Sequence, residues 1–289
     1  MNAQGSNTTF SFEFFPPKTP EGKNNLRATW QHLSKLNPHF FSVTFGAGGS
    51  TQSGTQETVL EIQQDSGIDA APHLSCIGSS QVKIRQILDD YSSHGVQRIV
   101  ALRGDFPSDM KDPGEFRHAN ELVEFIRAET GNYFHIEVAA YPEFHPTAPS
   151  ARVDFENFKR KVNAGANSAI TQYFYNPDAY LRFMDSCERL GVDIPIVPGI
   201  MPITNYTSLA GFSQRCGAEI PRWLDWRLQE FGEDTNGLKA FGIDVVTELC
   251  QRLLEAGAPG LHFYVLNRVE PAMTIWKNLG LPGAGNSPD

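Results

Sequence analysis

One carboxylate stands in an unexpected place near the start of the chain. Glu13 lies in the segment Thr9 to Pro17, where it is surrounded by four phenylalanines and followed by two prolines. Bulky aromatic residues before Pro-Pro are typical of a short buried strand, because proline cannot continue a hydrogen-bonded ladder. Burial of a carboxyl group raises its pKa and lets the group hold a proton near neutral pH. Glu13 is therefore a candidate general acid, and a structural glutamate paired with an arginine or capping a helix is the alternative.

Short apolar segments that could position such a side chain recur along the sequence. They alternate with amphipathic helical segments at a spacing of roughly thirty residues, and the region before the last strand predicts several helices where one is typical. The pattern predicts a single α/β domain, a (β/α)₈ TIM barrel over residues 1–282 with extra helices between strands seven and eight, and a flexible tail at 283–289. The predicted strands lie at 9–15, 40–45, 70–76, 98–102, 135–141, 168–174, 194–200 and 261–266.

Residues at the carboxyl ends of barrel strands share one mouth, whichever part of the chain they come from. They include two acids, one arginine and several hydrogen-bonding groups, a set that suits a neutral heterocyclic ligand with an acidic appendage. Two acids in one dry site tend to have their pKa values pushed apart, so Glu13 is assigned the protonated role and Asp105 the ionised role. The strand-end residues are Glu13, Thr44, His73, Asp105, Tyr141, Gln172, Tyr264 and Arg268.

The composition narrows the classes of function. The chain has 24 Lys and Arg against 33 Asp and Glu, a formal net charge of −9, which argues against nucleic-acid binding. We find no apolar run of membrane-spanning length and no signal peptide, so we expect a cytoplasmic protein with no membrane partner. Four separated cysteines and the absence of an H-E-x-x-H pair predict neither a disulfide framework nor a metal site; Glu143 and His145 are the nearest approach to one.

Four motifs together resemble those of bacterial methylenetetrahydrofolate reductases. They are Phe12 to Lys18, Ser42 to Thr51, Leu102 to Asp105 and Ala169 to Phe174, and the match extends over nearly the whole chain. The resemblance implies an FAD-dependent oxidoreductase, acting on a CH-NH group, that reduces 5,10-methylenetetrahydrofolate to 5-methyltetrahydrofolate. Hydride would pass from NAD(P)H, with NADH favoured, to the flavin and then to the folate in ping-pong order. The product would feed methionine synthesis and one-carbon metabolism.

The resemblance also implies roles for individual residues. Glu13 is similar to the general acid that protonates the aryl nitrogen of the folate and opens its methylene bridge to an iminium cation. Asp105 resembles an aspartate near the flavin that stabilises this cation. Taken alone, Asp105 would be assigned to loop initiation. The implied substrate contacts are Gln172, Phe212, Arg268, Tyr264 and Thr44.

The alternatives for three of these contacts stay open. Gln172 could satisfy loop backbone, Phe212 could be a core residue, and Arg268 could form a surface salt bridge.

An FAD site is implied at the mouth and on one helix. Four of its residues, from Asp154 to Lys161, repeat at helical spacing near one face at the start of that helix, where a diphosphate could be held; a solvated charged face is the alternative. The loop Gly46 to Gly49 does not predict a Rossmann site, because Thr51 replaces the third glycine of that fingerprint. The implied FAD-binding residues are Thr44, His73, Arg103, Gly104, Asp105, Tyr141, His145, Asp154, Asn157, Arg160 and Lys161.

Two other functions remain open from the sequence. The same barrel could take electrons from a partner protein instead of a nicotinamide, or it could bind folate or flavin without catalysis. The expected partners are therefore small molecules, 5,10-methylenetetrahydrofolate and NAD(P)H. The acidic composition is compatible with several oligomeric states, a homo-oligomer included.

Overall fold

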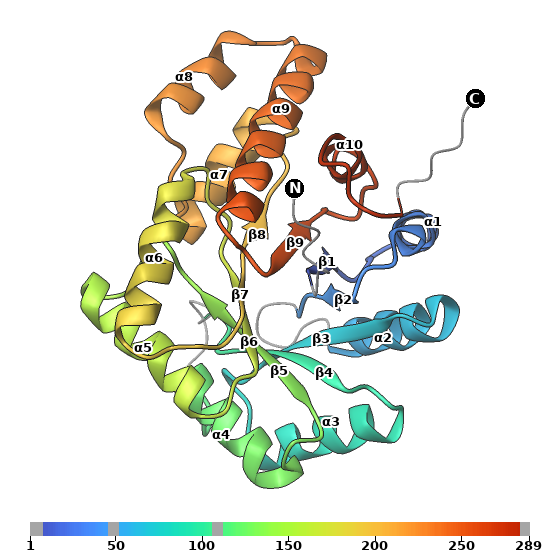
Figure 1. Cartoon of the computed structure of the whole chain (residues 1–289). Helices are drawn as coiled ribbons and strands as arrows, with labels where there is room; N and C mark the ends of the chain where they lie inside the picture. The colour runs from blue at the N-terminus through green and yellow to red at the C-terminus, as the bar shows by residue number, and fades with distance from the viewer. Residues whose placement is uncertain (1–7, 46–51, 106–111, 284–289) are drawn as a thin grey trace.

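The barrel is closed by strands from the two ends of the chain. The computed structural model describes residues 8–45, 52–105 and 112–283. Its strands pair in parallel in the order β7-β6-β5-β4-β3-β2-β1-β9-β8, with β1 hydrogen-bonded to both β2 and β9 (Figure 1). This arrangement confirms the predicted α/β barrel. The strands are β1 (Thr9–Phe14), β2 (Phe40–Val43), β3 (Asp69–Ser75), β4 (Arg98–Leu102), β5 (His135–Ala140), β6 (Ser168–Thr171), β7 (Ile196–Val197), β8 (Gly199–Ile200) and β9 (Gly260–Tyr264).

Helices alternate with the strands and surround the barrel (Figure 1). The first helix shows how the sequence determines where a helix begins and which side is buried. The Thr19 hydroxyl caps its amino end and Pro20 occupies its first turn. Its buried face consists of Leu26, Trp30 and Leu33. Three helices lie between β8 and β9, where one is typical, and so the extra helices that the sequence predicts are present. The helices are α1 (Pro20–Leu33), the 3-10 helix η1 (Ser34–Leu36), α2 (Gln52–Ser66), α3 (Gln81–Ser93), α4 (Ala119–Thr130), α5 (Ala151–Asn163), α6 (Pro177–Arg189), α7 (Tyr206–Cys216), α8 (Arg222–Glu230), α9 (Thr235–Glu255) and α10 (Ala272–Asn278).

The predicted seventh strand is divided into β7 and β8 at Pro198. Val197 pairs with Ile170 of β6, whereas Gly199 pairs with His262 of β9. Proline has no N–H to donate, so the ladder breaks at this position and the two halves bond to different neighbours. A side chain on Gly199 would lie 2.2 Å from the carbonyl oxygen of Thr171, so only glycine fits at this closure.

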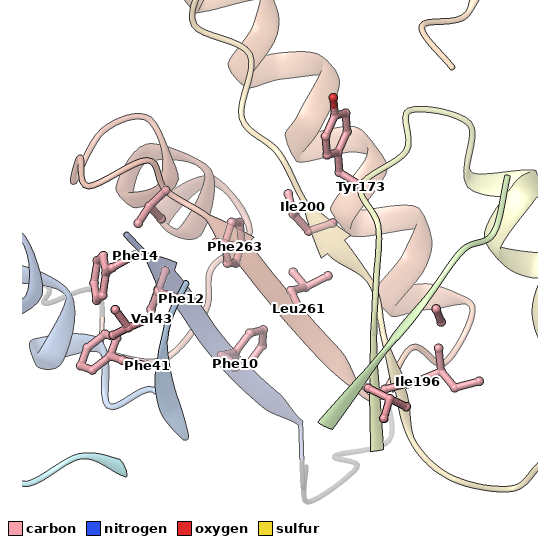
Figure 2. Packing of buried hydrophobic residues seen from close by; sticks show 14 of the residues in the cluster. Phe10, Phe12, Phe14, Phe41, Val43, Tyr173, Ile196, Ile200, Leu261 and Phe263 are labelled. Carbon is pink, nitrogen blue, oxygen red and sulfur yellow. The ribbon is translucent and has the colours of Figure 1, made fainter. Parts of the chain in front are cut away.

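The phenylalanines of β1 pack on the outside of the barrel, beneath its helices. Phe12 stacks on Phe263 at 5.6 Å between ring centroids, and Phe14 lies 5.2 Å from Phe41 (Figure 2). Side chains alternate between the two faces of a strand, so these rings point away from Glu13. The expectation that they form a dry environment around Glu13 is wrong.

Some predicted features lie outside the described residues: the glycine loop at 46–51, most of the loop after Asp105 (106–111) and nearly all of the tail (284–289). Within the described ranges, we find no helix with the length and apolar character needed to cross a membrane.

Candidate active site

Glu13 lies inside the barrel near the carboxyl end of β1, where side chains from three strands meet its carboxylate. Its Oε2 atom is 3.1 Å from Nε2 of His73 on β3 and 3.4 Å from Nε2 of His262 on β9. The Ser42 hydroxyl on β2 donates to the same oxygen at 3.5 Å. The parallel register explains this meeting, because Glu13 is paired with Ser42 on one side and with Tyr264 on the other.

His262 is a site residue that the sequence analysis missed. Its side chain is fully buried, and its Nδ1 atom lies 2.7 Å from the hydroxyl oxygen of Ser11. The alternation of side chains along a strand could have identified His262. Ser11 and Glu13 share one face of β1, and His262 and Tyr264 share one face of β9. The strand containing His262 was predicted, but its histidine was not assigned to the mouth.

The pKa of Glu13 is shifted in the direction opposite to the predicted one. Burial raises it, but the contacts with His73 and His262 outweigh this effect and lower the pKa to about 2. The His73 contact lacks the angle of a good hydrogen bond, yet its 3.1 Å separation is short enough for strong charge attraction. Glu13 is therefore ionised at neutral pH in this structure. The proton that the sequence analysis placed on it must come from elsewhere.

Other predicted residues lie where their strands end. Asp105 is exposed just after β4, and Thr44 follows β2, where its N–H donates to the carbonyl of Phe14 at 2.9 Å. Gln172 follows β6, and its side-chain oxygen accepts the N–H of Tyr173 at 3.0 Å. This contact matches the alternative in which Gln172 satisfies loop backbone, and within the described residues its amide nitrogen has no hydrogen-bond partner.

Tyr264 is the last residue of β9 and is paired with Glu13 of β1. Its hydroxyl donates to the carbonyl of Thr171 at 2.7 Å, and burial raises its pKa well above the ordinary value. A buried phenol with this raised pKa stays protonated, so Tyr264 offers a ligand its ring rather than a charge.

A second cluster lies at the ends of β4 and β5. The rings of Tyr141 and His145 meet edge to face at 4.7 Å, and the His145 N–H donates to Asp154 at 3.0 Å. Lys161 reaches back from α5 and donates to the carbonyl of Ala139 at 2.5 Å. Burial raises the pKa of Tyr141 to about 12, and the charges of Asp105 and Asp154 add to the effect. The structure therefore brings these predicted residues together.

Asn157 and Arg160 are not part of this cluster. Both are exposed on α5, and the Arg160 guanidinium donates to the Asn157 side chain at 3.1 Å. Only Asp154 lies in the first turn of α5, while Arg160 and Lys161 lie in its last turn. The prediction that all four residues share one face at the start of the helix is wrong. With 3.6 residues per turn, steps of three carry Asn157 and Arg160 progressively away from the direction of Asp154, whereas Lys161, about two full turns on, points nearly the same way as Asp154.

The inward cluster fits a ligand that carries phosphate. Burial lowers the pKa of Lys161 to about 8, and the Asp154 carboxylate opposes this shift only in part. Burial also lowers the pKa of His145, with Arg103 and Lys161 adding to the effect of burial. Buried cationic groups whose positive charge is not fully neutralised by nearby carboxylates would be stabilised by an anionic diphosphate.

Gly104 allows the chain to bend closely at the same place. Its φ is 86°, and a side chain on it would lie 1.8 Å from the Ser75 hydroxyl. A non-glycine residue is therefore excluded at this strand end on two grounds, backbone conformation and space.

Two predicted substrate contacts, Phe212 and Arg268, have exposed side chains. Phe212 on α7 is 41% exposed, so it is not a core residue, and the Arg215 guanidinium lies 4.8 Å from its ring centroid. Arg268 is exposed and forms no salt bridge within the described part of the chain. Arg268 and Tyr264 line one small pocket. Both observations leave these side chains free for a ligand.

A larger pocket, of about 330 Å³, lies away from Glu13. It is formed where the start of α7 faces the end of α8 and the start of α9, and it contains none of the predicted site residues. The side chains that converge on Glu13 lie elsewhere. The lining residues are Thr204, Asn205, Tyr206, Thr207, Leu228, Gln229, Gly232, Thr235 and Leu238.

Comparison with known proteins identifies the family. A family model described as methylenetetrahydrofolate reductase matches residues 1–280. The 5,10-methylenetetrahydrofolate reductases of Pectobacterium carotovorum and Escherichia coli are each 40% identical, over 94% of this chain and 90% and 91% of theirs. Methylenetetrahydrofolate reductase (NADH) 1 of Arabidopsis thaliana is also 40% identical, over 95% of this chain but 48% of its own length.

A solved structure shows the same fold at low sequence identity. It is an uncharacterized protein from Clostridium thermocellum, described as binding two copies of 5-methyl-5,6,7,8-tetrahydrofolic acid. The match covers 95% of both chains with a TM-score of 0.68 and 18% identity. Together with the matches to sequence relatives over nearly the full chain, these findings show that the chain belongs to the methylenetetrahydrofolate reductase family.

Proposed function

We propose that this protein is an FAD-dependent reductase that converts 5,10-methylenetetrahydrofolate to 5-methyltetrahydrofolate with electrons from NAD(P)H. The observation that carries the proposal is the Glu13 carboxylate at the barrel mouth, faced by two imidazoles, in a chain of this family. The names of the bacterial and plant relatives support the reaction, and the plant name favours NADH. The Clostridium thermocellum protein of the same fold is described as binding a folate, which supports a folate as the ligand here.

The cluster at the ends of β4 and β5 is the proposed flavin site. Arg103, His145 and Lys161 would bind the diphosphate, and Gly104 would let the backbone approach the cofactor. FAD bound there supplies a carrier that accepts hydride from the nicotinamide and gives it to the one-carbon unit of the folate. Asn157 and Arg160 are left out of this proposal, because both side chains are exposed outside the cluster.

The remaining residues act on the folate. Its methylene bridge is a poor hydride acceptor until the aryl nitrogen is protonated and the ring opens to an iminium cation. Glu13 would deliver that proton, and the exposed carboxylate of Asp105 would stabilise the cation by charge. Gln172 offers an amide for the pterin, Phe212 an exposed ring for stacking, and Arg268 a guanidinium for the acidic tail.

An anaerobic experiment with the purified FAD-loaded protein tests the proposal. Addition of NADH should bleach the flavin absorbance, and addition of 5,10-methylenetetrahydrofolate should then restore it with formation of 5-methyltetrahydrofolate. If NADH and NADPH both fail to bleach the flavin, but dithionite-reduced flavin is reoxidised by the folate, the electron donor is a partner protein. Failure of the folate to reoxidise reduced flavin would reject the reductase and leave a binding protein.

A further inference from the structure

The helix that carries Phe212 is attached to the barrel by few apolar side chains. The buried residues of α7 are Leu209 and Ser213, and only the first of these is apolar. Tyr206 and Cys216 pack against the core with partly buried side chains. An amphipathic helix normally packs through a continuous apolar stripe. The attachment of α7 therefore depends in large part on the polar contact that Ser213 makes.

Ser213 makes this contact with Tyr173, which follows the end of β6. The two hydroxyl oxygens are 3.0 Å apart, and both side chains are buried. Burial raises the pKa of Tyr173 above its ordinary value, so the phenol keeps its proton and either hydroxyl can donate to the other. The Cys216 thiol, one turn farther along α7, donates to the phenol oxygen at 3.4 Å. The hydrogen bond between the hydroxyls therefore joins the end of a barrel strand to the inner side of α7.

The Tyr173 ring is held by two other tyrosines. Its centroid lies 5.8 Å from that of Tyr175 and 6.5 Å from that of Tyr264, both edge to face. Each neighbour is itself fixed, because Tyr264 donates to the carbonyl of Thr171 and Tyr175 donates to the carbonyl of Met201 at 3.1 Å. Figure 2 shows the Tyr173 hydroxyl pointing away from the other labelled side chains. The ring therefore presents its hydroxyl to α7 at a fixed place.

The residues that precede the two hydroxyls are both proposed folate contacts. Gln172 precedes Tyr173, and its side-chain oxygen accepts the Tyr173 N–H at 3.0 Å. Phe212 precedes Ser213, and consecutive side chains of a helix point about 100° apart. With Ser213 turned inward, Phe212 is therefore turned toward solvent.

We propose that Tyr173 and Ser213 are positioning residues, whose hydrogen bond sets the rotation of α7 and so holds Phe212 in register with Gln172 for the folate. The proposal rests on the function proposed above. Neither hydroxyl has to touch the folate, because the two act through the side chains that precede them. Loss of either hydroxyl leaves the other without this partner in a buried place, and α7 is then free to shift.

The first test follows oxidation of reduced flavin by 5,10-methylenetetrahydrofolate in the FAD-loaded enzyme. In Tyr173→Phe and in Ser213→Ala, the folate concentration that gives half the limiting rate should rise about three- to tenfold, the usual effect of one neutral hydrogen bond. The limiting rate should change less than about twofold, since the groups near the reacting atoms are kept. The double variant should be no worse than either single variant, because it leaves no hydroxyl unpaired. Wild-type half-saturation in both single variants, or additive effects in the double variant, would overturn the inference.

The matched control is Tyr175→Phe. It removes an equally buried phenol hydroxyl from the same cluster, but one that donates to Met201 rather than to α7. Its half-saturating folate concentration should match that of the wild type. A rise as large as that of Tyr173→Phe would show a general loss of packing and would reject the positioning role.

The second test needs no folate. Hydrogen–deuterium exchange of the FAD-loaded protein, followed by mass spectrometry, reports local opening of α7. Peptides from α7 should exchange about three- to tenfold faster in Tyr173→Phe and Ser213→Ala than in the wild type or Tyr175→Phe, while peptides from α10 stay unchanged. Unchanged exchange of α7 in both variants would overturn the link. Failure of the wild type to pass hydride to folate would instead reject the proposed function, whatever the exchange shows.

Discussion

Two carboxylates in the barrel interior, Glu13 and Glu137, are faced by histidine, and their contacts differ. Glu137 lies mid-strand in β5 with its side chain 3% exposed, and receives Arg98 at 2.6 Å and Ser168 at 2.6 Å on different oxygens. Glu13 lies one residue from the end of β1, and the described contacts reach only its Oε2 atom, at 3.1 to 3.5 Å. Burial raises both pKa values and the partners lower both below the ordinary range. The direction of the pKa shift therefore does not distinguish Glu13 from Glu137. The number of carboxylate oxygens with hydrogen-bond partners, and the length of those contacts, does.

This difference suggests that Glu137 stabilises the fold and that Glu13 is kept available. A carboxylate with both oxygens hydrogen-bonded at 2.6 Å is held strongly by its present partners. Longer contacts on one oxygen leave the other free for a ligand.

The largest effect is expected from Glu13→Gln. Loss of the general acid should slow oxidation of reduced flavin by the folate by about 10² to 10⁴-fold, while NADH still reduces the flavin at the wild-type rate. Stopped-flow absorbance of each half-reaction separates the two steps. The matched change, Glu137→Gln, should leave the folate step of the folded enzyme near wild type. If both half-reactions fell together in Glu13→Gln, the general-acid assignment would be wrong.

Arg98→Met should mainly affect stability. It leaves the Glu137 charge buried without its arginine partner, and the free energy of unfolding should fall by about 3 kcal/mol. Urea unfolding at pH 7 measures the loss. A change below about 1 kcal/mol would mean that the Arg98 pair is no stronger than an exposed salt bridge and would break the contrast with Glu13.

The acid limb of the stability curve should report Glu13 as well. Its folded pKa of about 2 lies below the ordinary 4.5, so its stabilising contribution is fully present above pH 4.5 and is lost as the pH falls toward 2. The contribution is about 3 kcal/mol at most. Urea unfolding between pH 6 and 3 should show a shallower fall for Glu13→Gln than for the wild type. Equal slopes would show that the histidine contacts do not hold Glu13 ionised.

The smallest effect is expected from Arg268→Met, the counterpart of Arg98→Met. Because Arg268 is exposed and forms no salt bridge in the described structure, its loss should change the free energy of unfolding by less than about 0.5 kcal/mol. The KM for the folate should rise several-fold, with kcat little changed, since the tail lies away from the reacting atoms. A fall in kcat with unchanged KM would remove Arg268 from the proposed tail site.

Local patterns predicted most of the fold but not the division of one strand. The strand predicted at 194–200 contains the proline that divides it into β7 and β8. From the sequence, the segment is one apolar run. Its two halves bond to different strands because of barrel closure, which is a property of the whole sheet.

The position of Glu13 was predictable, whereas its protonation state was not. The strand ending at Pro16 and Pro17 placed its carboxyl group at the mouth. Its pKa depends on His262, which is 249 residues away in the sequence, and on His73 from a third strand. The aromatic neighbours in the sequence suggested the wrong surroundings, because consecutive side chains point to opposite faces. The mistaken helix face at Asn157 and Arg160 has a similar origin, since their spacing alone did not show which side of α5 packs on the barrel.

The pairing of β1 with β9 has a consequence for how the protein is made in the cell. Ser11 and His262, which meet in the finished barrel, are 251 residues apart. At about 5–20 residues per second, a ribosome needs about 10–50 s to travel between them. During that time the aromatic face of Phe10 and Phe12 lacks Phe263 and Trp276, the rings that pack on it. This face is therefore a surface on which a nascent-chain chaperone would be expected to act.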